Sequence, residues 1–288
     1  MSANGKILDT IGSMYDSLTK TEKRIAKTLL ANPHLLNQSS LSAIALDLDV
    51  GEATFIRFCR TLGFKGFTDF KLDLAIELAT QDKDDTALLD TDISPNDSAQ
   101  NIGLKLQTAI HNVITETMNL LNFDELNKVV TAFKQAKRIF LFGVGSSGIT
   151  AEDAKNKFMR IGLQVDAAMN NHFMYMQASL MHKGDVVLGI SHSGYSQETI
   201  HALSIAQKAG AMTIALTHNL RSPITKVADL VLINGNRQGQ MQGDSIGTKI
   251  AQLFVLDLIY ALIVQSEEEK AAKTKQKTLN VILEQRIK

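Results

Sequence analysis

The chain contains few of the residues that would tie it to an oxidising compartment, a metal or a membrane. Its 288 residues include one cysteine, Cys59, so no disulfide can form within the chain and a cysteine-based zinc site is disfavoured. The N-terminus has no basic segment followed by an apolar core, so no signal peptide is expected. The longest apolar run, 253–264, is interrupted by Asp257 and is too short to span a bilayer. These absences favour a soluble, cytoplasmic protein with no membrane partner.

Charge of one sign is not in excess either. Lysine plus arginine and aspartate plus glutamate both number 30, so the formal net charge is zero. Residues 1–80 are balanced as well, with nine basic and nine acidic side chains. Composition therefore gives no argument for nucleic-acid binding, and any basic surface would have to arise by segregation of charges.

Proline is also scarce, and one of only three prolines, Pro95, lies in a polar, acidic stretch without a core-forming period. We interpret this stretch, 81–97, as a linker. It separates a region of helical pattern, 1–80, from a region 98–288 in which strands and helices alternate after Phe123.

Five β-branched or apolar runs in the second region predict strands, at 139–142, 165–167, 186–190, 213–216 and 230–233. Helical patterns separate most of these runs, and this alternation predicts a parallel sheet with helices on both faces. In such sheets ligands bind beyond the carboxyl ends of the strands.

A loop rich in hydroxyl groups follows the third predicted strand. Ser191, Ser193 and Ser196 lie between that strand and the start of a helix. A helix N-terminus offers unpaired N–H groups and a partial positive charge, so the loop suits an anion such as a phosphate. The alternative is that Ser196 is an N-cap and the other serines are ordinary turn residues.

A second loop of the same kind follows the first predicted strand and carries Ser146 and Ser147. Its three glycines match the G-x-G-x-x-G fingerprint of dinucleotide-binding folds, and Asp166 lies near the position of the ribose-binding acid. A nicotinamide enzyme is therefore an alternative. It leaves the two serines and the second serine loop unexplained. The glycines of the fingerprint are Gly143, Gly145 and Gly148.

The N-terminal region has the pattern of a helix-turn-helix. A capping box formed by Thr19 and Glu22 opens a helix, and two short helices at 40–48 and 52–62 flank a tight turn at 49–51. One face of the second helix carries three polar side chains that suit phosphate or base edges. The alternative is a plain helical domain with solvated arginines. The three side chains are Thr54, Arg57 and Arg60.

The motifs in this order resemble those of the RpiR family of bacterial transcriptional regulators. In that family a helix-turn-helix domain precedes a SIS (sugar isomerase) domain that binds phosphosugars. The resemblance rests on 18–26, 53–60, 62–67, 143–147, 191–194 and 215–217. Gly51 departs from it, because the family often has serine there.

The resemblance implies an all-α helix-turn-helix domain followed by an α/β SIS domain with a five-stranded parallel sheet. It implies a regulator of a sugar or amino-sugar catabolic operon that binds operator DNA. The effector would be a phosphorylated sugar or N-acetylated amino sugar. It implies ligand contacts for the five loop serines, Ser146, Ser147, Ser191, Ser193 and Ser196, and we add Lys65 to the DNA-binding residues.

His172, at the start of a helix after the second strand, is a further candidate for a ligand contact, although a histidine among Phe, Met and Tyr is often structural. The other histidines have no metal-ligand spacing, and neither a metal nor a cofactor is expected. The main functional alternative is an aldose–ketose isomerase, for which Glu198 and His192 are available. A third interpretation uses the N-terminal domain only for dimerisation.

Apolar stripes at 98–121 and 246–264, together with the family resemblance, predict a homodimer, with a tetramer as an alternative. The stripes could instead be buried within one subunit. A dimer would present two DNA-binding domains to a near-palindromic site. The attached helix-turn-helix, which isomerisation does not require, favours a regulator that is not an enzyme.

Overall fold

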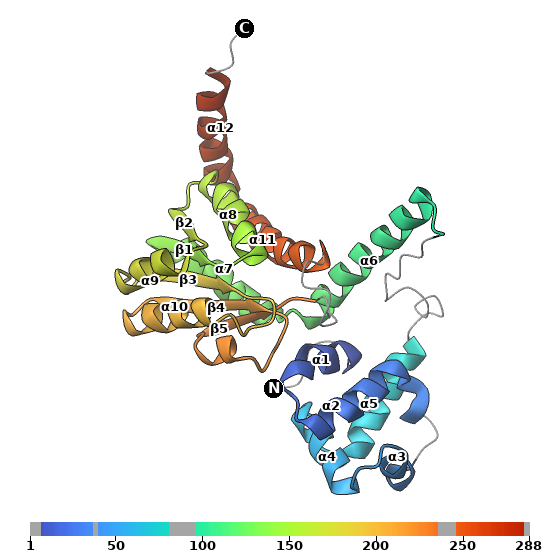
Figure 1. Cartoon of the computed structure of the whole chain (residues 1–288). Coiled ribbons are helices and arrows are strands. Elements are labelled where there is room, and N and C mark those ends of the chain that lie inside the picture. The colour runs from blue at the N-terminus through green and yellow to red at the C-terminus, as the bar shows by residue number, and fades with distance from the viewer. Residues whose placement is uncertain (1–6, 37–39, 81–95, 236–245, 285–288) are drawn as a thin grey trace. The chain divides into compact units, whose positions relative to one another are not determined.

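The computed structural model describes residues 7–36, 40–80, 96–235 and 246–284. The chain divides into two compact units (Figure 1). One is built mainly from residues up to Leu121, and the other mainly from residues from Asn122 onward. Most of the predicted linker lies outside the described residues, and the proposed boundaries 1–80, 81–97 and 98–288 remain a proposal.

Helices alone form the described part of the first unit. Thr19 opens α2 as predicted, because its hydroxyl accepts from the Glu22 amide and the Glu22 carboxylate accepts from the Thr19 amide at 3.0 Å. The elements are α1 (Ile7–Met14), η1 (Tyr15–Ser17), α2 (Lys20–Ala31), η2 (Pro33–Leu36), α3 (Leu41–Asp47), α4 (Glu52–Thr61), α5 (Phe67–Thr80) and α6 (Ala99–Leu120).

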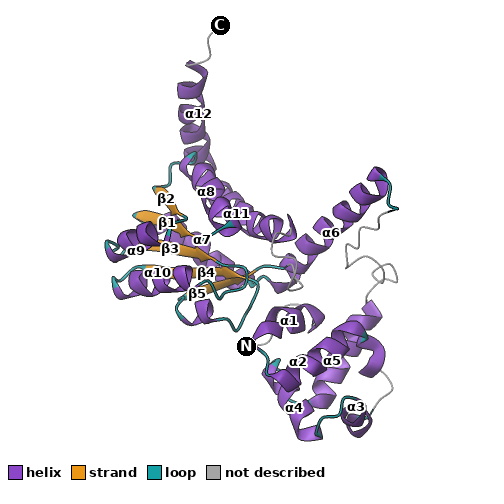
Figure 2. Cartoon of the chain, viewed as in Figure 1, coloured by secondary structure: helices purple, strands orange, loops and turns teal. Residues whose placement is uncertain are grey.

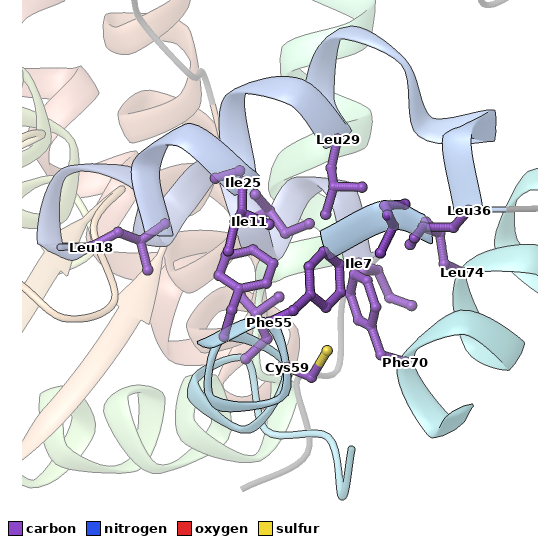
Figure 3. Close-up of a cluster of buried hydrophobic side chains, with 14 of the residues drawn as sticks. Ile7, Ile11, Leu18, Ile25, Leu29, Leu36, Phe55, Cys59, Phe70 and Leu74 are labelled. Carbon is purple, nitrogen blue, oxygen red and sulfur yellow. The ribbon is translucent and has the colours of Figure 1, made fainter. Parts of the chain in front are cut away.

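The core of this unit is a cluster of phenylalanine rings with aliphatic side chains around them (Figure 3). Phe55 makes edge-to-face contacts with Phe58 and Phe70, with ring centroids 6.0 and 6.4 Å apart. Each such pair contributes roughly 0.5–1.5 kcal/mol beyond the burial of its area. Cys59 is fully buried beside them, and burial raises the pKa of its thiol to about 12, so it is a core residue and not a nucleophile.

Helix α6 groups by its contacts with the first unit, whereas the sequence analysis places it at the start of the second region. It packs against α1, and Val113 and Thr117 are buried. Other apolar residues of α6 are exposed to solvent, Leu104 to 55% and Met118 to 41%.

The second unit is a five-stranded parallel sheet in the order β2-β1-β3-β4-β5 with helices on both faces (Figure 2). The predicted sheet and its helical layers are therefore confirmed. Its elements are α7 (Phe123–Gln135), β1 (Arg138–Phe142), α8 (Ser146–Met159), β2 (Val165–Ala168), α9 (Asn171–Ser179), β3 (Asp185–Ile190), α10 (Gln197–Lys208), β4 (Met212–Thr217), η3 (Pro223–Lys226), β5 (Leu230–Ile233), α11 (Ile246–Ser266) and α12 (Glu268–Glu284).

The order of the strands creates one reversal. The chain leaves β1 for β2 on one side, then returns past β1 to build β3, β4 and β5 on the other side. Helices α9 and α10 pack together on one face, and α8 and α11 pack together with α7 beside α11. The reversal lies between β1 and β3, which pair directly, with Phe142 opposite Gly189.

Helix α11 is long and apolar enough to cross a membrane by length and composition. The apolar run 253–264, on which the sequence-based expectation rests, is too short to do so. The helix has 21 residues, and an 18-residue stretch of it has a mean hydropathy of 1.7. In the structure it packs on α7 and α8 and buries a face that includes Ala251, Val255 and Ile259. These contacts are those of a core helix.

An ion pair joins β1 and β3 at the amino ends of the strands, opposite to the serine loops. Arg138 donates from Nε to Asp185 Oδ1 at 3.1 Å and from a terminal nitrogen to Oδ2 at 2.5 Å. The hydrogen bond from Arg138 lowers the pKa of Asp185, whose side chain is buried. The pair joins the first residues of β1 and β3, so it fixes the register of the two strands whose far ends carry the serine loops.

Candidate ligand-binding loops and DNA-binding face

The two serine loops lie side by side at the carboxyl ends of β1 and β3. Since these strands are neighbours, Ser146 at the start of α8 and Ser196 before α10 flank the point where the strand order reverses. Crevices at such switch points bind ligands in open α/β sheets. The N-termini of α8 and α10 both begin at this edge, and both favour an anion there.

The loop after β3 is held by its own hydroxyl groups. Ser191, which is buried, donates its hydroxyl to Ser196 Oγ at 3.0 Å and accepts from the Gly194 amide at 3.2 Å. Ser196 is the N-cap of α10 by position, but its side chain makes no capping hydrogen bond. The Ser193 hydroxyl accepts from the Tyr195 amide at 3.2 Å, and its side chain is exposed.

The last residue of β4 and the residue after it make hydrogen bonds to this loop. The carbonyl oxygen of His192 accepts hydrogen bonds from Thr217 Oγ1 at 3.1 Å and from the His218 amide at 2.9 Å. The imidazole rings of His192 and His218 are stacked, with centroids 5.2 Å apart. Sequence reasoning assigned no role to His218, and its only signal was a position two residues after a predicted strand.

Gly194 is required by the close approach of that segment. Its φ of +72° lies in the left-handed region, and a Cβ there would lie 2.0 Å from Ser222 Oγ. The carbonyl oxygen of Gly194 also accepts from the Ile224 amide at 3.2 Å. The loop is therefore pressed against the turn that begins η3, and its backbone is fixed on two sides.

The loop after β1 leads into two serines, of which one is buried and one is half-buried. Ser147 is buried and accepts a hydrogen bond at Oγ from Gln252 Nε2 of α11 at 3.1 Å. Ser146, the first residue of α8, is half-buried. Gln252 was not singled out from the sequence, although a glutamine between apolar residues of a helix is a visible signal.

His172 lies on the first turn of α9, after the edge strand β2. Its amide donates to the Asn170 side chain at 2.9 Å, and its own side chain is exposed. An exposed ring is not a core histidine. Because β2 pairs with β1, this turn begins at the same edge of the sheet as the serine loops.

Asp166, the acid of the dinucleotide alternative, is engaged elsewhere. It accepts from Gln177 Nε2 at 2.7 Å and lies 3.3 Å from Lys155 Nζ. Among the described residues no cluster of three or more His, Cys, Asp and Glu side chains could hold a metal ion.

The first unit presents a separate polar face on α4. Helix α3, a turn and α4 form the predicted pair of helices, and Asp49 takes the left-handed conformation of the turn with a φ of 47°. Gly51 is the N-cap of α4 without a side-chain cap. The structural features match a helix-turn-helix, in which the second helix enters the major groove.

Three predicted side chains lie together on this face. Arg57 and Arg60 are exposed, and a terminal nitrogen of Arg57 donates to Thr54 Oγ1 at 3.0 Å. They line an open hollow of about 640 Å³ with residues of the α2 N-terminus. A second hollow of about 850 Å³ is lined by Arg60, Lys65 and Lys71. The first hollow also contains the acidic Glu22, whereas no acidic side chain of the described residues lines the second, so positive charge is segregated only at the second hollow.

Comparison with known proteins follows the same division. The helix-turn-helix domain of the rpiR family matches residues 5–81, and the SIS domain matches residues 132–262. An HTH-type transcriptional regulator of Haemophilus influenzae is 66% identical over 288 residues, which is all of both chains. The chain belongs to the RpiR family. The RpiR family member of Escherichia coli K12, the HTH-type transcriptional regulator RpiR, is 30% identical over 91% of this chain and 88% of its own length.

A solved structure of the same architecture is the Vibrio vulnificus NanR protein complexed with ManNAc-6P. It is 25% identical, with a TM-score of 0.63, and the match covers 98% of this chain and all of NanR. This member of the RpiR family is thus a transcriptional regulator with a DNA-binding helix-turn-helix domain and a SIS domain, and the predicted family and fold class are confirmed. Because the SIS match includes the glycine-rich loop at 143–148, it favours a SIS domain over the dinucleotide-binding alternative.

Proposed function

We propose that this regulator controls an operon for the catabolism of a sugar or amino sugar and that a phosphosugar bound at the two serine loops sets its affinity for operator DNA. The observation that carries the proposal is the juxtaposition of these loops at the reversal between β1 and β3. Five serines are proposed to form the phosphate site: Ser146, Ser147, Ser193 and Ser196 by direct contact, and Ser191 through its hydrogen bond to Ser196.

The chemistry of the loops suits reversible sensing. Neither 143–148 nor 191–197 contains lysine or arginine. A phosphate there would be held by hydroxyls, backbone N–H groups and the N-termini of α8 and α10. Such a site stabilises a dianion without a permanent ion pair, so occupancy follows the concentration of the metabolite.

An N-acetylated amino-sugar phosphate is the effector class that we favour. NanR, which matches the chain over nearly its full length, is complexed with ManNAc-6P. His172, exposed at the same sheet edge, is the proposed donor to a sugar hydroxyl or to the N-acyl oxygen.

For DNA, we propose that α4 enters the major groove and that Thr54, Arg57, Arg60 and Lys65 contact the operator. Arginine reads guanine through two parallel hydrogen bonds, and threonine suits a phosphate or a thymine methyl. The hydrogen bond between Arg57 and Thr54 supports this arrangement, because it holds the guanidinium in place before DNA arrives.

We propose further that the protein acts in the cytoplasm as a homodimer. Of the two predicted apolar stripes, the one on α11 is largely used inside the subunit, where it buries eight residues. The stripe on α6 leaves Leu104 and Leu106 exposed and is the stronger candidate for a dimer contact. Light scattering at micromolar concentration tests this, and a monomer that binds a single half-site would contradict it.

A thermal-shift screen with phosphosugars tests the effector proposal. A ligand that binds only the folded state at a hundred times its Kd raises the free energy of unfolding by about 2.7 kcal/mol. We expect N-acetylated hexosamine 6-phosphates to raise the melting temperature, and their unphosphorylated forms to leave it unchanged. If the protein instead interconverts an aldose phosphate and its ketose at an enzyme-like rate, the isomerase alternative replaces the sensor.

A further inference from the structure

Gln252 occupies an unusual position in α11. The helix is strongly apolar and packs on α8, and Gln252 is fully buried. Its Nε2 donates to Ser147 Oγ at 3.1 Å, while Oε1 has no hydrogen-bond partner in the part of the chain that the structure describes. A buried polar atom left unpaired costs about 1–3 kcal/mol, whereas an apolar side chain of similar size would be nearly neutral. Packing alone does not account for this residue.

The hydrogen bond determines which way the hydroxyl of Ser147 points. A serine hydroxyl has one proton to donate and two lone pairs that accept. Because the amide Nε2 can only donate, one lone pair of Ser147 Oγ is engaged by Gln252 and the proton is directed elsewhere. Ser147 lies in the first turn of α8, at the carboxyl end of β1, where β1 pairs with β3.

We propose that Gln252 is a positioning residue that keeps the Ser147 hydroxyl as a hydrogen-bond donor to the phosphate group of the ligand. Gln252 itself does not touch the ligand. This inference rests on the proposed function of the serine loops as a phosphosugar site. A phosphate dianion only accepts hydrogen bonds, so a serine that donates to it stabilises the complex and a serine whose proton is taken up by another acceptor does not.

Two substitutions separate this role from a structural one. Gln252→Leu removes the donor and the unpaired buried oxygen together, so the melting temperature is expected to hold or rise while ligand affinity falls about tenfold. Gln252→Glu places a carboxylate that accepts the Ser147 proton, and at pH 8 affinity is expected to fall further, on the order of a hundredfold. When the pH is lowered, the protonated carboxyl group can donate to Ser147, and the affinity of the Gln252→Glu protein is expected to recover relative to wild type.

A double-mutant cycle provides the decisive measurement. Isothermal titration of the full chain with ManNAc-6P and with inorganic phosphate would compare wild type, Ser147→Ala, Gln252→Leu and the double variant. If Gln252 acts only through Ser147, then Gln252→Leu costs nothing further once Ser147 is alanine. Gln252→Met serves as a second apolar variant in case leucine prevents folding, and Ile259→Val, buried two turns along the same helix, is the matched control.

The outcomes are distinct. Additive losses in the cycle, or wild-type affinity in Gln252→Leu with Gln252→Glu showing no recovery at low pH, would overturn the role of Gln252 while leaving the phosphosugar site intact. If the wild-type protein binds neither probe, the proposed function fails and this inference fails with it. Equal losses in Ser147→Ala, Gln252→Leu and the double variant support it.

Discussion

The hydroxyl of Ser191 donates to the hydroxyl of Ser196 at 3.0 Å, across the turn that joins β3 to α10. Ser191 is buried and Ser196 is half-buried, so the buried hydroxyl of Ser191 holds the more exposed side chain of Ser196 in place. The contact leaves Ser196 with its own proton free to donate, because its oxygen is the acceptor. The loop is therefore arranged before a ligand arrives, which lowers the entropy lost on binding.

We predict that Ser191→Ala and Ser196→Ala both weaken binding of the phosphosugar, by different routes. Ser196→Ala removes a proposed direct contact and is expected to cost about 1.5–3 kcal/mol of ligand affinity. Ser191→Ala removes the support and an acceptor for the Gly194 amide, so it is expected to lower the free energy of unfolding as well. Calorimetric titration together with thermal melting separates the two. Equal losses of stability in both variants would contradict the difference in roles.

Gly194→Ala is predicted to be among the most damaging single substitutions in the loop. The added Cβ would lie 2.0 Å from Ser222 Oγ, and its backbone is in the left-handed region. Strain of this kind costs about 1–3 kcal/mol before the clash is counted. Gly145→Ala is the comparison for a positive φ without a clash: its φ is +57°, its ψ is −132°, and no atom lies within 4 Å of its Cβ.

The melting temperatures of the two glycine variants test this prediction. Gly194→Ala should melt clearly below Gly145→Ala, and Ser222→Gly should recover part of the difference by removing the clash. If the two glycine variants melt together, the close packing of the loop against the start of η3 is wrong.

On the DNA side, Arg57→Ala and Arg60→Ala are predicted to weaken specific operator binding by about 1–3 kcal/mol, the value of a bidentate contact between arginine and guanine. Both side chains are exposed, so the fold should be retained. A gel shift with operator and with unrelated DNA measures the effect. Unchanged operator affinity in both variants would remove α4 from the interface.

The sequence anticipated the elements whose patterns are local. The capping box of Thr19 and Glu22, both helices of the helix-turn-helix and all five strands were found, because each depends on neighbours a few residues apart. The serine loops were found for the same reason, since each follows a β-branched run directly.

Contacts between distant residues were not accessible in this way. The hydrogen bond from Gln252 to Ser147 joins residues 105 positions apart, and it depends on how α11 lies on α8. The clash that makes Gly194 obligatory involves Ser222, which is brought there by the turn after β4. The grouping of α6 with the first unit also depends on packing, in its contact with α1, and helical periodicity alone cannot report it.

The ion pair at the opposite edge of the sheet predicts a pH dependence of stability. The hydrogen bond from Arg138 lowers the folded-state pKa of Asp185 below its ordinary value of 3.8. A carboxylate with a depressed pKa contributes stability above the pKa of the unfolded state and loses it as the pH falls through the folded value. The contribution of Asp185 should therefore be complete at neutral pH and decline below about pH 4.

Asp185→Asn tests this contribution. At pH 7 it is expected to lower the free energy of unfolding by about 1.5–3 kcal/mol, because the charged partner of Arg138 is lost. The difference from wild type should shrink as the pH is lowered below 4. Urea unfolding at several pH values measures it, and a difference that stays constant with pH would show that the charge of Asp185 is not what matters.

Sensing requires that the two domains be coupled, and such coupling is reciprocal. If the phosphosugar weakens DNA binding, DNA must weaken binding of the phosphosugar by the same factor. Ser193, exposed on the loop after β3, is the residue at which this is best tested, because its substitution leaves the DNA-binding face untouched. The most direct measurement is the anisotropy of labelled operator DNA, bound to wild-type or Ser193→Ala protein, during titration with ManNAc-6P. We predict equal operator affinity without ligand and a change in DNA binding that requires about tenfold or more ligand in the variant. A response of both complexes at the same ligand concentration would contradict the claim that this loop is the sensor.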